Sequence, residues 1–413
     1  MKEYAFVLSF AIPFFILLMI IEFTAGKIKG IEVYRPFDTI TSISSGITNV
    51  VKDILGLIVV IVSYQWMYKN LALFSLSSSV LMYVLAFISL DFAGYWSHRF
   101  EHTVNIFWNR HIIHHSSEEY NLACALRQNF SALFAVFTFL LLPAAILGVP
   151  PEIINIVAPL HLFAQFWYHT RLIGKMGILE SFIVTPSHHR VHHAINEIYL
   201  DKNYGQVFIL WDKWFGTFQQ ELEQEPPVYG VKRPVATWNA LEINFQHFWL
   251  LLKDAFYTKS WKDKCRIWFM PTGWRPEDVA QKNAITVVSN PFELNKYNHK
   301  TSFWSSYWMW FQLLFSLLLL FHFFSQIGDA AYPYLLVYGF FILVNIFSFN
   351  ALMDGHWASL IGECIKFFII LGIWMNFGNW FQLPIYWIIA WQLVSLAITV
   401  AVIKEERAGL ALN

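Results

Sequence analysis

Charged residues are scarce in this chain. Of its 413 residues only 14% are charged, whereas 57% are hydrophobic and 19% are aromatic. An ordinary soluble domain has about a quarter of its residues charged, so the composition excludes that class and predicts a membrane protein. The formal net charge is zero and no long basic or acidic run occurs, so the sequence gives no indication of a nucleic-acid partner.

Cysteine is also scarce. Cys124, Cys265 and Cys364 are widely separated and form no Cys-x-x-Cys pair. Their spacing therefore indicates neither a disulfide framework nor a thiolate metal site. A His-Glu-x-x-His motif is missing as well, which lowers the expectation of a hydrolytic zinc enzyme without excluding one.

Long apolar runs occur throughout the chain. A helix needs about 20 largely apolar residues to cross a bilayer. We therefore predict an all-α, polytopic helical bundle of about nine spans, in which Met1–Ile21 belongs to a retained first helix and not to a cleaved signal peptide. The expected spans are Tyr4–Phe23, Ile47–Trp66, Leu76–Trp96, Phe130–Leu147, Ile153–Tyr168, Phe303–Phe324, Pro333–Phe349, Cys364–Trp380 and Leu383–Ile403.

Basic residues predict the orientation of these spans. They follow the first span, occur throughout the segment 171–300 and follow the last span. With nine spans all three groups fall on one side, which the positive-inside rule makes the cytosolic side. The histidine-rich segments fall on that same side, in a bacterial inner membrane or an endoplasmic reticulum. The basic residues next to the first and last spans are Lys27, Lys29, Arg35, Lys404 and Arg407.

Most of the fifteen histidines fall in three short blocks, 98–102, 111–115 and 188–193. Residues three or four apart share a helix face, so each block is expected to form one cluster of imidazoles that can chelate a metal. If the blocks converge, eight imidazoles would supply two metals with about four ligands each. Iron, zinc and copper all suit such ligands. The eight are His98, His102, His111, His114, His115, His189, His192 and His193.

Two classes of function are open to such a cluster. Imidazoles at a membrane border, beside spans that can hold a lipid chain, suggest activation of oxygen against a C–H bond of a lipid. A metal transporter or metal-binding membrane protein is the alternative from another class. Against transport, the histidines form one lateral cluster and the spans carry few acidic residues along a path.

The three blocks, in this order, resemble the fatty acid hydroxylase / sterol desaturase superfamily of integral-membrane di-iron enzymes. The match runs from about Asp91 to Thr237 and is most similar to the alkylglycerol monooxygenase branch. The segments that carry this resemblance are 111–121, 125–128, 165–170, 185–193, 201–205 and 211–218.

The resemblance implies a reaction. It is hydroxylation of the carbon beside the ether oxygen of an alkylglycerol, followed by collapse to a fatty aldehyde and glycerol. It also implies two irons per chain, a lipid substrate, and tetrahydrobiopterin or another reductant as the electron donor. A sterol or fatty acyl hydroxylase or desaturase of the same superfamily is the alternative.

The resemblance also assigns the eight block histidines as metal ligands and suggests His169 as a ninth. Related enzymes often have a His-x-x-x-His pair here, but Gln165 occupies its first position. His188 lies about 100° from His189 on a helix, so we expect it to be structural. His161 is expected to belong to the core.

Four polar residues are candidates for a supporting role around the ligands: Asp91, Glu118, Asp201 and Asn203. Asp91 lies seven residues before His98 on the same helical face, where its carboxylate could hold the free ring nitrogen. Glu118 is similarly placed after the second block, and the last two fall where the family keeps polar residues. Thr103 stands where the family tends to place a carboxylate, so the sequence assigns no role to Glu101.

Four regions follow from these patterns: N-terminal transmembrane helices (1–90), a fatty acid hydroxylase-like catalytic region (91–240), a cytosolic or interfacial segment (241–300) and C-terminal transmembrane helices (301–413). Trp261–Trp274 is either an interfacial segment or an ordinary amphipathic surface helix. Trp211–Phe218 is expected to be a packed turn that supports the last block. Asp354–His356 is expected to be a loop between spans.

Overall fold

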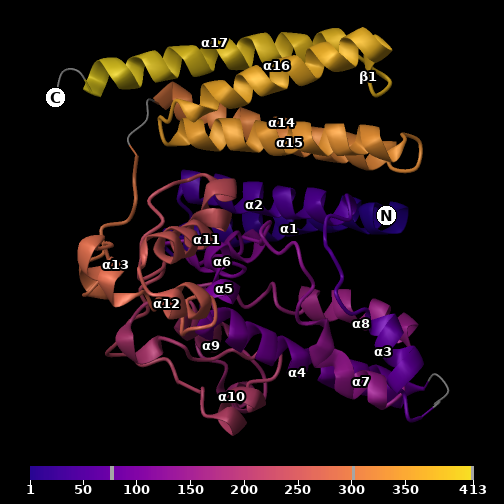
Figure 1. The fold of residues 1–413 in the computed structure, drawn as a ribbon, viewed down its shortest axis with the longest axis vertical. Helices are drawn as coiled ribbons and strands as arrows, with labels where there is room; N and C mark the ends of the chain where they lie inside the picture. The colour runs from indigo at the N-terminus through magenta and orange to yellow at the C-terminus, as the bar shows by residue number, and fades with distance from the viewer. Residues whose placement is uncertain (75–78, 300–302, 411–413) are drawn as a thin grey trace.

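The chain is almost entirely helical. The computed structural model describes residues 1–74, 79–299 and 303–410 (Figure 1), with 63% helix and one two-stranded antiparallel pair, β1 (Asn379–Trp380) and β2 (Leu383–Pro384). The predicted all-α class is confirmed. Four residues that bound expected spans or regions, Leu76, Lys300, Thr301 and Asn413, lie outside the described residues.

Within the described ranges, six helices are long and apolar enough to cross a membrane, which fits an integral membrane protein. They lie with their long axes in similar directions in Figure 1. The expected count of about nine spans is not confirmed. The six are α1 (Lys2–Ile28), α4 (Val80–Thr103), α14 (Phe303–Gln326), α15 (Tyr332–Met353), α16 (Ala358–Phe377) and α17 (Ile385–Leu410).

The expected span Ile47–Trp66 is not a single helix. α2 (Pro36–Ile54) ends early, Gly56 adopts a φ of 61°, and α3 (Tyr64–Leu71) starts separately. α2 packs against α14 and α15, and protein contacts satisfy polar side chains that would be costly in lipid. Its buried polar residues include Asp38, Thr41, Ser42, Ser45, Thr48 and Lys52.

The fourth and fifth expected spans are also shorter than predicted. In place of Phe130–Leu147 there are a 3-10 turn (Thr138–Leu141) and the one-turn helix α7 (Leu142–Ile146). α8 (Pro151–Phe163) replaces the fifth span. The tight connection between them depends on Gly148, whose φ is 75° and where a Cβ would lie 2.1 Å from the carbonyl oxygen of Phe74.

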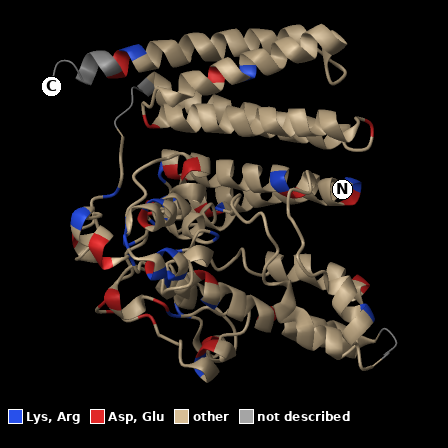
Figure 2. Cartoon of the chain, viewed as in Figure 1, with Lys and Arg blue, Asp and Glu red and all other residues tan. Residues whose placement is uncertain are grey.

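Short helices form a cap at one end of the long helices (Figure 1), and most charged residues gather around it (Figure 2). The cap helices are α5 (Asn105–Trp108), α6 (Ile112–His115), α9 (Pro186–His192), α10 (Leu210–Phe215), α11 (Ala240–Tyr257), α12 (Trp261–Arg266) and α13 (Glu277–Lys282). α12 covers only part of the expected Trp261–Trp274 helix. Because Trp261 and Phe269 are 79% and 72% exposed, the interfacial and surface interpretations both stay predictions.

Contacts between distant segments tie the basic regions to this cap. Lys29 Nζ donates to the carbonyl oxygen of Leu172 at 3.2 Å, and His299 Nε2 lies 3.4 Å from a carboxylate oxygen of Glu406. The ends of α1 and α17 therefore lie beside the segment 171–299. Asp354, in the confirmed loop between α15 and α16, accepts a hydrogen bond from the Trp238 amide at 3.0 Å.

Candidate metal centre

Three short helical turns bring the histidine blocks together. The last two turns of α4 carry His98 and His102, which lie one helical turn apart. His111 precedes α6, and α9 begins with Pro186 at its first position and ends at the third block. Proline is suited to the first turn of a helix because it lacks an amide hydrogen, which fixes where α9 starts.

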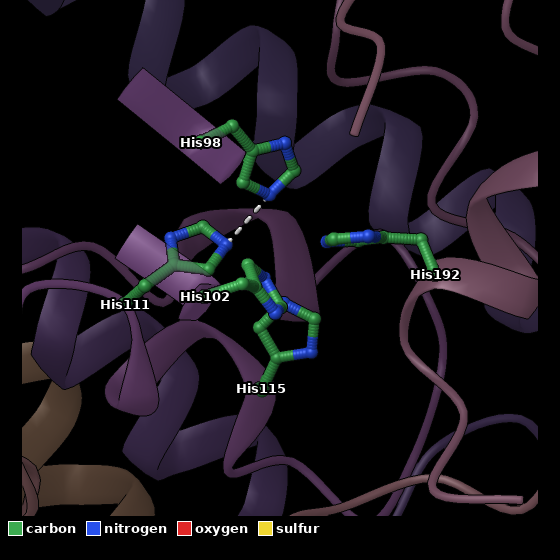
Figure 3. A group of neighbouring side chains, drawn as sticks. All are labelled: His98, His102, His111, His115 and His192. Atoms are coloured by element: carbon green, nitrogen blue, oxygen red, sulfur yellow. Dashed lines mark hydrogen bonds between the residues drawn. The ribbon is translucent and has the colours of Figure 1, made fainter. Parts of the chain in front are cut away.

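The nine expected ligands converge into two groups. The first histidine group is His98, His102, His111, His115 and His192, and its members point toward one another in Figure 3. The second histidine group is His114, His169, His189 and His193. Within each group one ring nitrogen per residue lies within 4.8 Å of all the others. Their role as metal ligands remains a prediction.

The blocks do not act as one cluster each, which corrects the sequence expectation. His114 and His115 are neighbours in α6 but belong to different groups, as do His192 and His193 at the end of α9. Successive helical residues point about 100° apart, so adjacent imidazoles face two different centres. The first histidine group therefore combines residues of all three blocks, and the second combines residues of the second and third blocks with His169.

The outer ring nitrogens of four histidines are held by the backbone. Because a carbonyl oxygen only accepts, each Nδ1 carries the proton and the Nε2 lone pair is left free to point inward. The Nδ1–O distances are 2.8 Å for His98 to Tyr204, 3.0 Å for His192 to Lys202, 3.0 Å for His169 to Gln165 and 3.2 Å for His114 to Arg127.

The inner Nε2 atoms have no ordinary partner. Those of His98 and His111 lie 2.9 Å apart, and those of His169 and His189 lie 3.0 Å apart. Such pairs of nitrogens need a shared cation or proton between them. The Nε2 atoms of three more histidines are buried without any hydrogen bond, a costly state that metal coordination would relieve. These three are His102, His115 and His192.

Burial keeps the histidines of the second and third blocks, and His169, in their neutral form. It lowers the pKa of six of them well below the ordinary value of 6.5, with neighbouring imidazoles adding to the effect. The pKa of His169 falls to about 3 for the same reason. A neutral imidazole is the form that binds metal, so the site fits a metal at neutral pH. The six are His111, His114, His115, His189, His192 and His193.

Asp91 does not hold His98, contrary to expectation. Seven residues of helix separate the two along the axis by about 10.5 Å, too far for a hydrogen bond. The fully buried carboxylate instead accepts from the amides of Val207 and Phe208 at 2.8 and 3.0 Å, from Trp211 Nε1 at 2.8 Å and from His161 Nε2 at 2.8 Å. Asp91 thus fixes the loop that carries the Tyr204 carbonyl.

Of the other supporting candidates, Glu118 differs from expectation, whereas Asp201 and Asn203 lie near the histidine blocks. Glu118 accepts from the Tyr297 amide at 2.7 Å and bonds to no histidine among the described residues. Asp201 lies beside His102, with 4.0 Å between carboxylate oxygen and Nδ1. Asn203 is buried and joins loops: its side-chain amide donates to the carbonyls of His188 and Gln219 at 3.1 and 2.7 Å.

Two carboxylates to which the sequence analysis assigned no role support the site. Glu101 accepts from Arg110 Nε at 2.9 Å and lies 3.5 Å from Nδ1 of His111. Asp212 accepts from the amides of Tyr204 and Gly205, both at 2.7 Å. The sequence signal for Glu101 was Arg110, nine residues further along the chain, because its guanidinium can pair with the carboxylate.

The remaining histidines lie outside both groups. His188 packs its ring 5.6 Å from that of Phe218, in the segment expected to support the last block. His161 is buried against Asp91. Gln165 holds His169 through its carbonyl, while its side-chain amide donates to Gln206 Oε1 at 3.1 Å.

Comparisons with known proteins show which families the sequence is similar to. The model of the fatty acid hydroxylase family matches residues 83–217. The chain is 40% identical to alkylglycerol monooxygenase of Homo sapiens over 64% of this chain and 59% of that protein, and 34% identical to that of Danio rerio over 68% and 64%. It is 26% identical to an ornithine lipid hydroxylase of Rhizobium tropici over 37% and 46%. The chain thus spans about three fifths of the alkylglycerol monooxygenases, and no solved structure matches it.

Proposed function

We propose that this chain, which carries a fatty acid hydroxylase domain over residues 83–217, is a membrane monooxygenase that hydroxylates a lipid. The observation that carries the proposal is the set of inward Nε2 atoms in two histidine groups. The groups lie at the cap end of helices that fit a membrane protein, where a lipid and water-soluble reactants can both reach them. We propose that this end faces the cytosol, since the basic segments lie there.

The nine histidines would hold two irons. The five of the first group would hold one iron, and the four of the second group would hold the other. Bound there, the metals would supply the activation of O₂ against a C–H bond. Neutral imidazoles leave such a centre positively charged and able to bind an oxygen ligand. The hydrolytic alternative receives no support from the geometry, because no carboxylate joins either group among the described residues.

Aromatic side chains pack against both groups. The Trp108 ring lies 5.1 Å from that of His102, and the Tyr120 ring lies 5.2 Å from that of His193. The Tyr204 ring packs 5.3 Å from His102. These rings hold the imidazoles in place and would limit the contact between an oxidising centre and solvent on the sides that they cover.

We propose a glyceryl ether as the substrate, as the names of the most similar relatives suggest. One atom of O₂ enters the C–H bond beside the ether oxygen, and two electrons and two protons reduce the other to water. The hemiacetal then loses its C–O bond to give a fatty aldehyde and a glycerol hydroxyl. Tetrahydrobiopterin or another reductant would donate the electrons.

The test is metal analysis of detergent-purified full-length protein together with a search for aldehyde. Wild type, His192→Ala and His356→Ala are compared, the last as a control because it removes an exposed imidazole outside both groups. We expect about two irons per wild-type chain, with aldehyde released from an alkylglycerol only when O₂ and a reductant are present. The control should match wild type, and His192→Ala should lose activity.

Other outcomes separate the alternatives. Iron with O₂-dependent oxidation of a sterol or fatty acyl chain, but no aldehyde from ethers, would replace the substrate and keep the oxygenase. Stoichiometric zinc without oxygen consumption, or metal movement into vesicles without reductant, would overturn the monooxygenase and favour binding or transport.

A further inference from the structure

A cavity of about 330 Å³ lies between the cap and the histidine groups. Its inner end is formed by His102, His115 and His192 of the first histidine group and by His193 of the second. Much of the remaining wall is apolar and comes from the cap, including Ile195, Leu200, Val231, Leu251, Ile285 and Val287. A bound molecule would therefore contact apolar side chains on its way to the candidate metal centre.

Two buried polar atoms in this wall, outside the histidine groups, have no hydrogen-bond partner among the residues that the structure describes. They are Nη1 of Arg233 and Oγ1 of Thr272. A buried donor without an acceptor costs free energy, and a guanidinium carries its charge as well. Two such atoms in one cavity indicate a missing acceptor.

The other cations of the wall have partners. Arg275 donates to both carboxylate oxygens of Asp254, at 2.6 and 2.9 Å, and Lys232 lies 3.3 Å from Glu197. In the described part of the chain Arg233 makes no ion pair. Burial lowers its pKa, the charge of Arg275 lowers it further, and the charge of Asp254 raises it in part. An anion in the cavity would offset both effects.

We propose that this cavity binds the phosphate group of an amphiphile, with Arg233 and Thr272 as its donors and the apolar wall leading its other end to the first histidine group. A guanidinium offers paired N–H donors that match phosphate oxygens, and a threonine hydroxyl adds a third donor. The inference rests on the proposed function in one respect: among the glyceryl ethers that the centre would oxidise, those that carry a phosphate group would bind more tightly than neutral alkylglycerols.

The position of the cavity agrees with this ligand. Arg233 and Thr272 belong to the segments that follow α10 and α12, outside all six candidate membrane helices. A phosphate there would stay out of the hydrocarbon, where charge is costly. A soluble phosphorylated molecule has the same chemistry at the donors, so the experiment must separate the two sources.

Calorimetric titration of the full-length protein in a maltoside detergent tests the proposal, because it measures binding without requiring turnover. The probes are a short-chain alkylglycerol phosphate, the matching neutral alkylglycerol and glycerol phosphate. The variants are Arg233→Gln and Thr272→Val, with Lys232→Gln as a control that removes the neighbouring charge. Thr272→Val keeps side-chain volume and serves if Arg233→Gln does not fold.

We expect the alkylglycerol phosphate to bind at least about tenfold more tightly than the neutral lipid, and Arg233→Gln to abolish that preference. Thr272→Val should weaken it by a smaller factor, and Lys232→Gln should leave it nearly intact. Glycerol phosphate binding as tightly as the lipid would keep the phosphate site and overturn the lipid source.

Equal binding of charged and neutral lipids, or equal losses in Arg233→Gln and Lys232→Gln, would overturn the phosphate site. Different results would overturn the proposed function and the phosphate site. Aldehyde release from neutral alkylglycerol with no effect of Arg233→Gln would overturn only this inference, whereas Arg233-dependent phosphate binding without any lipid oxidation would overturn only the monooxygenase.

Discussion

Nδ1 of His98 lies 2.8 Å from the carbonyl oxygen of Tyr204, a residue 106 positions further along the chain. The carbonyl is fixed in turn, because the Tyr204 amide donates to Asp212. The imidazole of His98, near the end of α4, is thus oriented by the loop that follows the third histidine block. The stability of that loop should therefore determine how well the first histidine group holds metal.

Asp212→Asn should weaken metal binding although Asp212 contacts no histidine of either group. The carboxylate accepts from Tyr204 and Gly205, and an asparagine would offer one acceptor oxygen in place of two. Loss of a supporting hydrogen bond of this kind typically costs about tenfold or more in metal affinity. Competition with a chelator measures the change, and Glu223→Gln, an exposed carboxylate nearby, is the control. Equal affinities in the two variants would contradict the prediction.

Two substitutions within the third histidine block should differ in their effect on bound iron. His193→Ala removes one of four ligands of the second histidine group and should reduce bound iron from about two per chain toward one. His188→Ala, in the same block but outside both groups, should retain both irons. Metal analysis of folded, monodisperse protein distinguishes the two. Loss of iron in both variants would show that the block acts only as a whole.

The stability of the protein should depend on pH through His247. Burial lowers the pKa of this residue from 6.5 to about 4. Between these values the unfolded chain binds a proton that the folded chain does not, so the free energy of unfolding falls as pH falls through this range, by at most about 3 kcal/mol.

His247→Gln should therefore lose less thermal stability than wild type between pH 7 and pH 5, since the amide can still donate to the Asn105 carbonyl that Nε2 contacts at 2.9 Å. Melting temperatures at the two pH values, with metal loading held equal, provide the measurement. His356→Gln is the exposed control, and a wild-type decline that persists in full in His247→Gln would rule out this residue as the cause.

A buried ion pair within the C-terminal helices should show strong coupling. Lys366 Nζ lies 2.8 Å from Glu363 Oε1 in α16, and both side chains are 1% exposed. Lys366→Met alone leaves a buried carboxylate without its cation and should cost about 3–5 kcal/mol. The double variant Glu363→Gln/Lys366→Met should cost less than the sum of the single variants. Unfolding in detergent measures all three, and simple additivity would show that the pair is not coupled.

The sequence was a good guide to which histidines would meet and a poor guide to how they divide. Helical spacing brought out the three blocks, and the resemblance added His169, which lies in the second histidine group. The division depends on α6 being a single turn and on α9 ending at His192, and spacing does not specify where helices this short begin and end. Adjacent imidazoles then face different centres.

Contacts between residues far apart in the chain could not be predicted from the sequence either. Asp91 shares a helix face with His98, but its partners are amides from Val207 and Phe208, more than a hundred residues away in the chain. The same limit applies to the spans. Hydropathy identified the six long apolar helices. It also predicted that the helix containing α2 continues beyond Ile54, because the residues there are apolar. The packing of α2 against α14 and α15 could not be read from hydropathy.

The division of His192 and His193 between the two groups has a consequence for how the chain can be divided. A single peptide bond joins a residue of one centre to a residue of the other, and the same is true of His114 and His115. No cut in the chain separates one centre from its partner. Neither group can therefore be removed as a continuous segment of the chain without removing residues of the other.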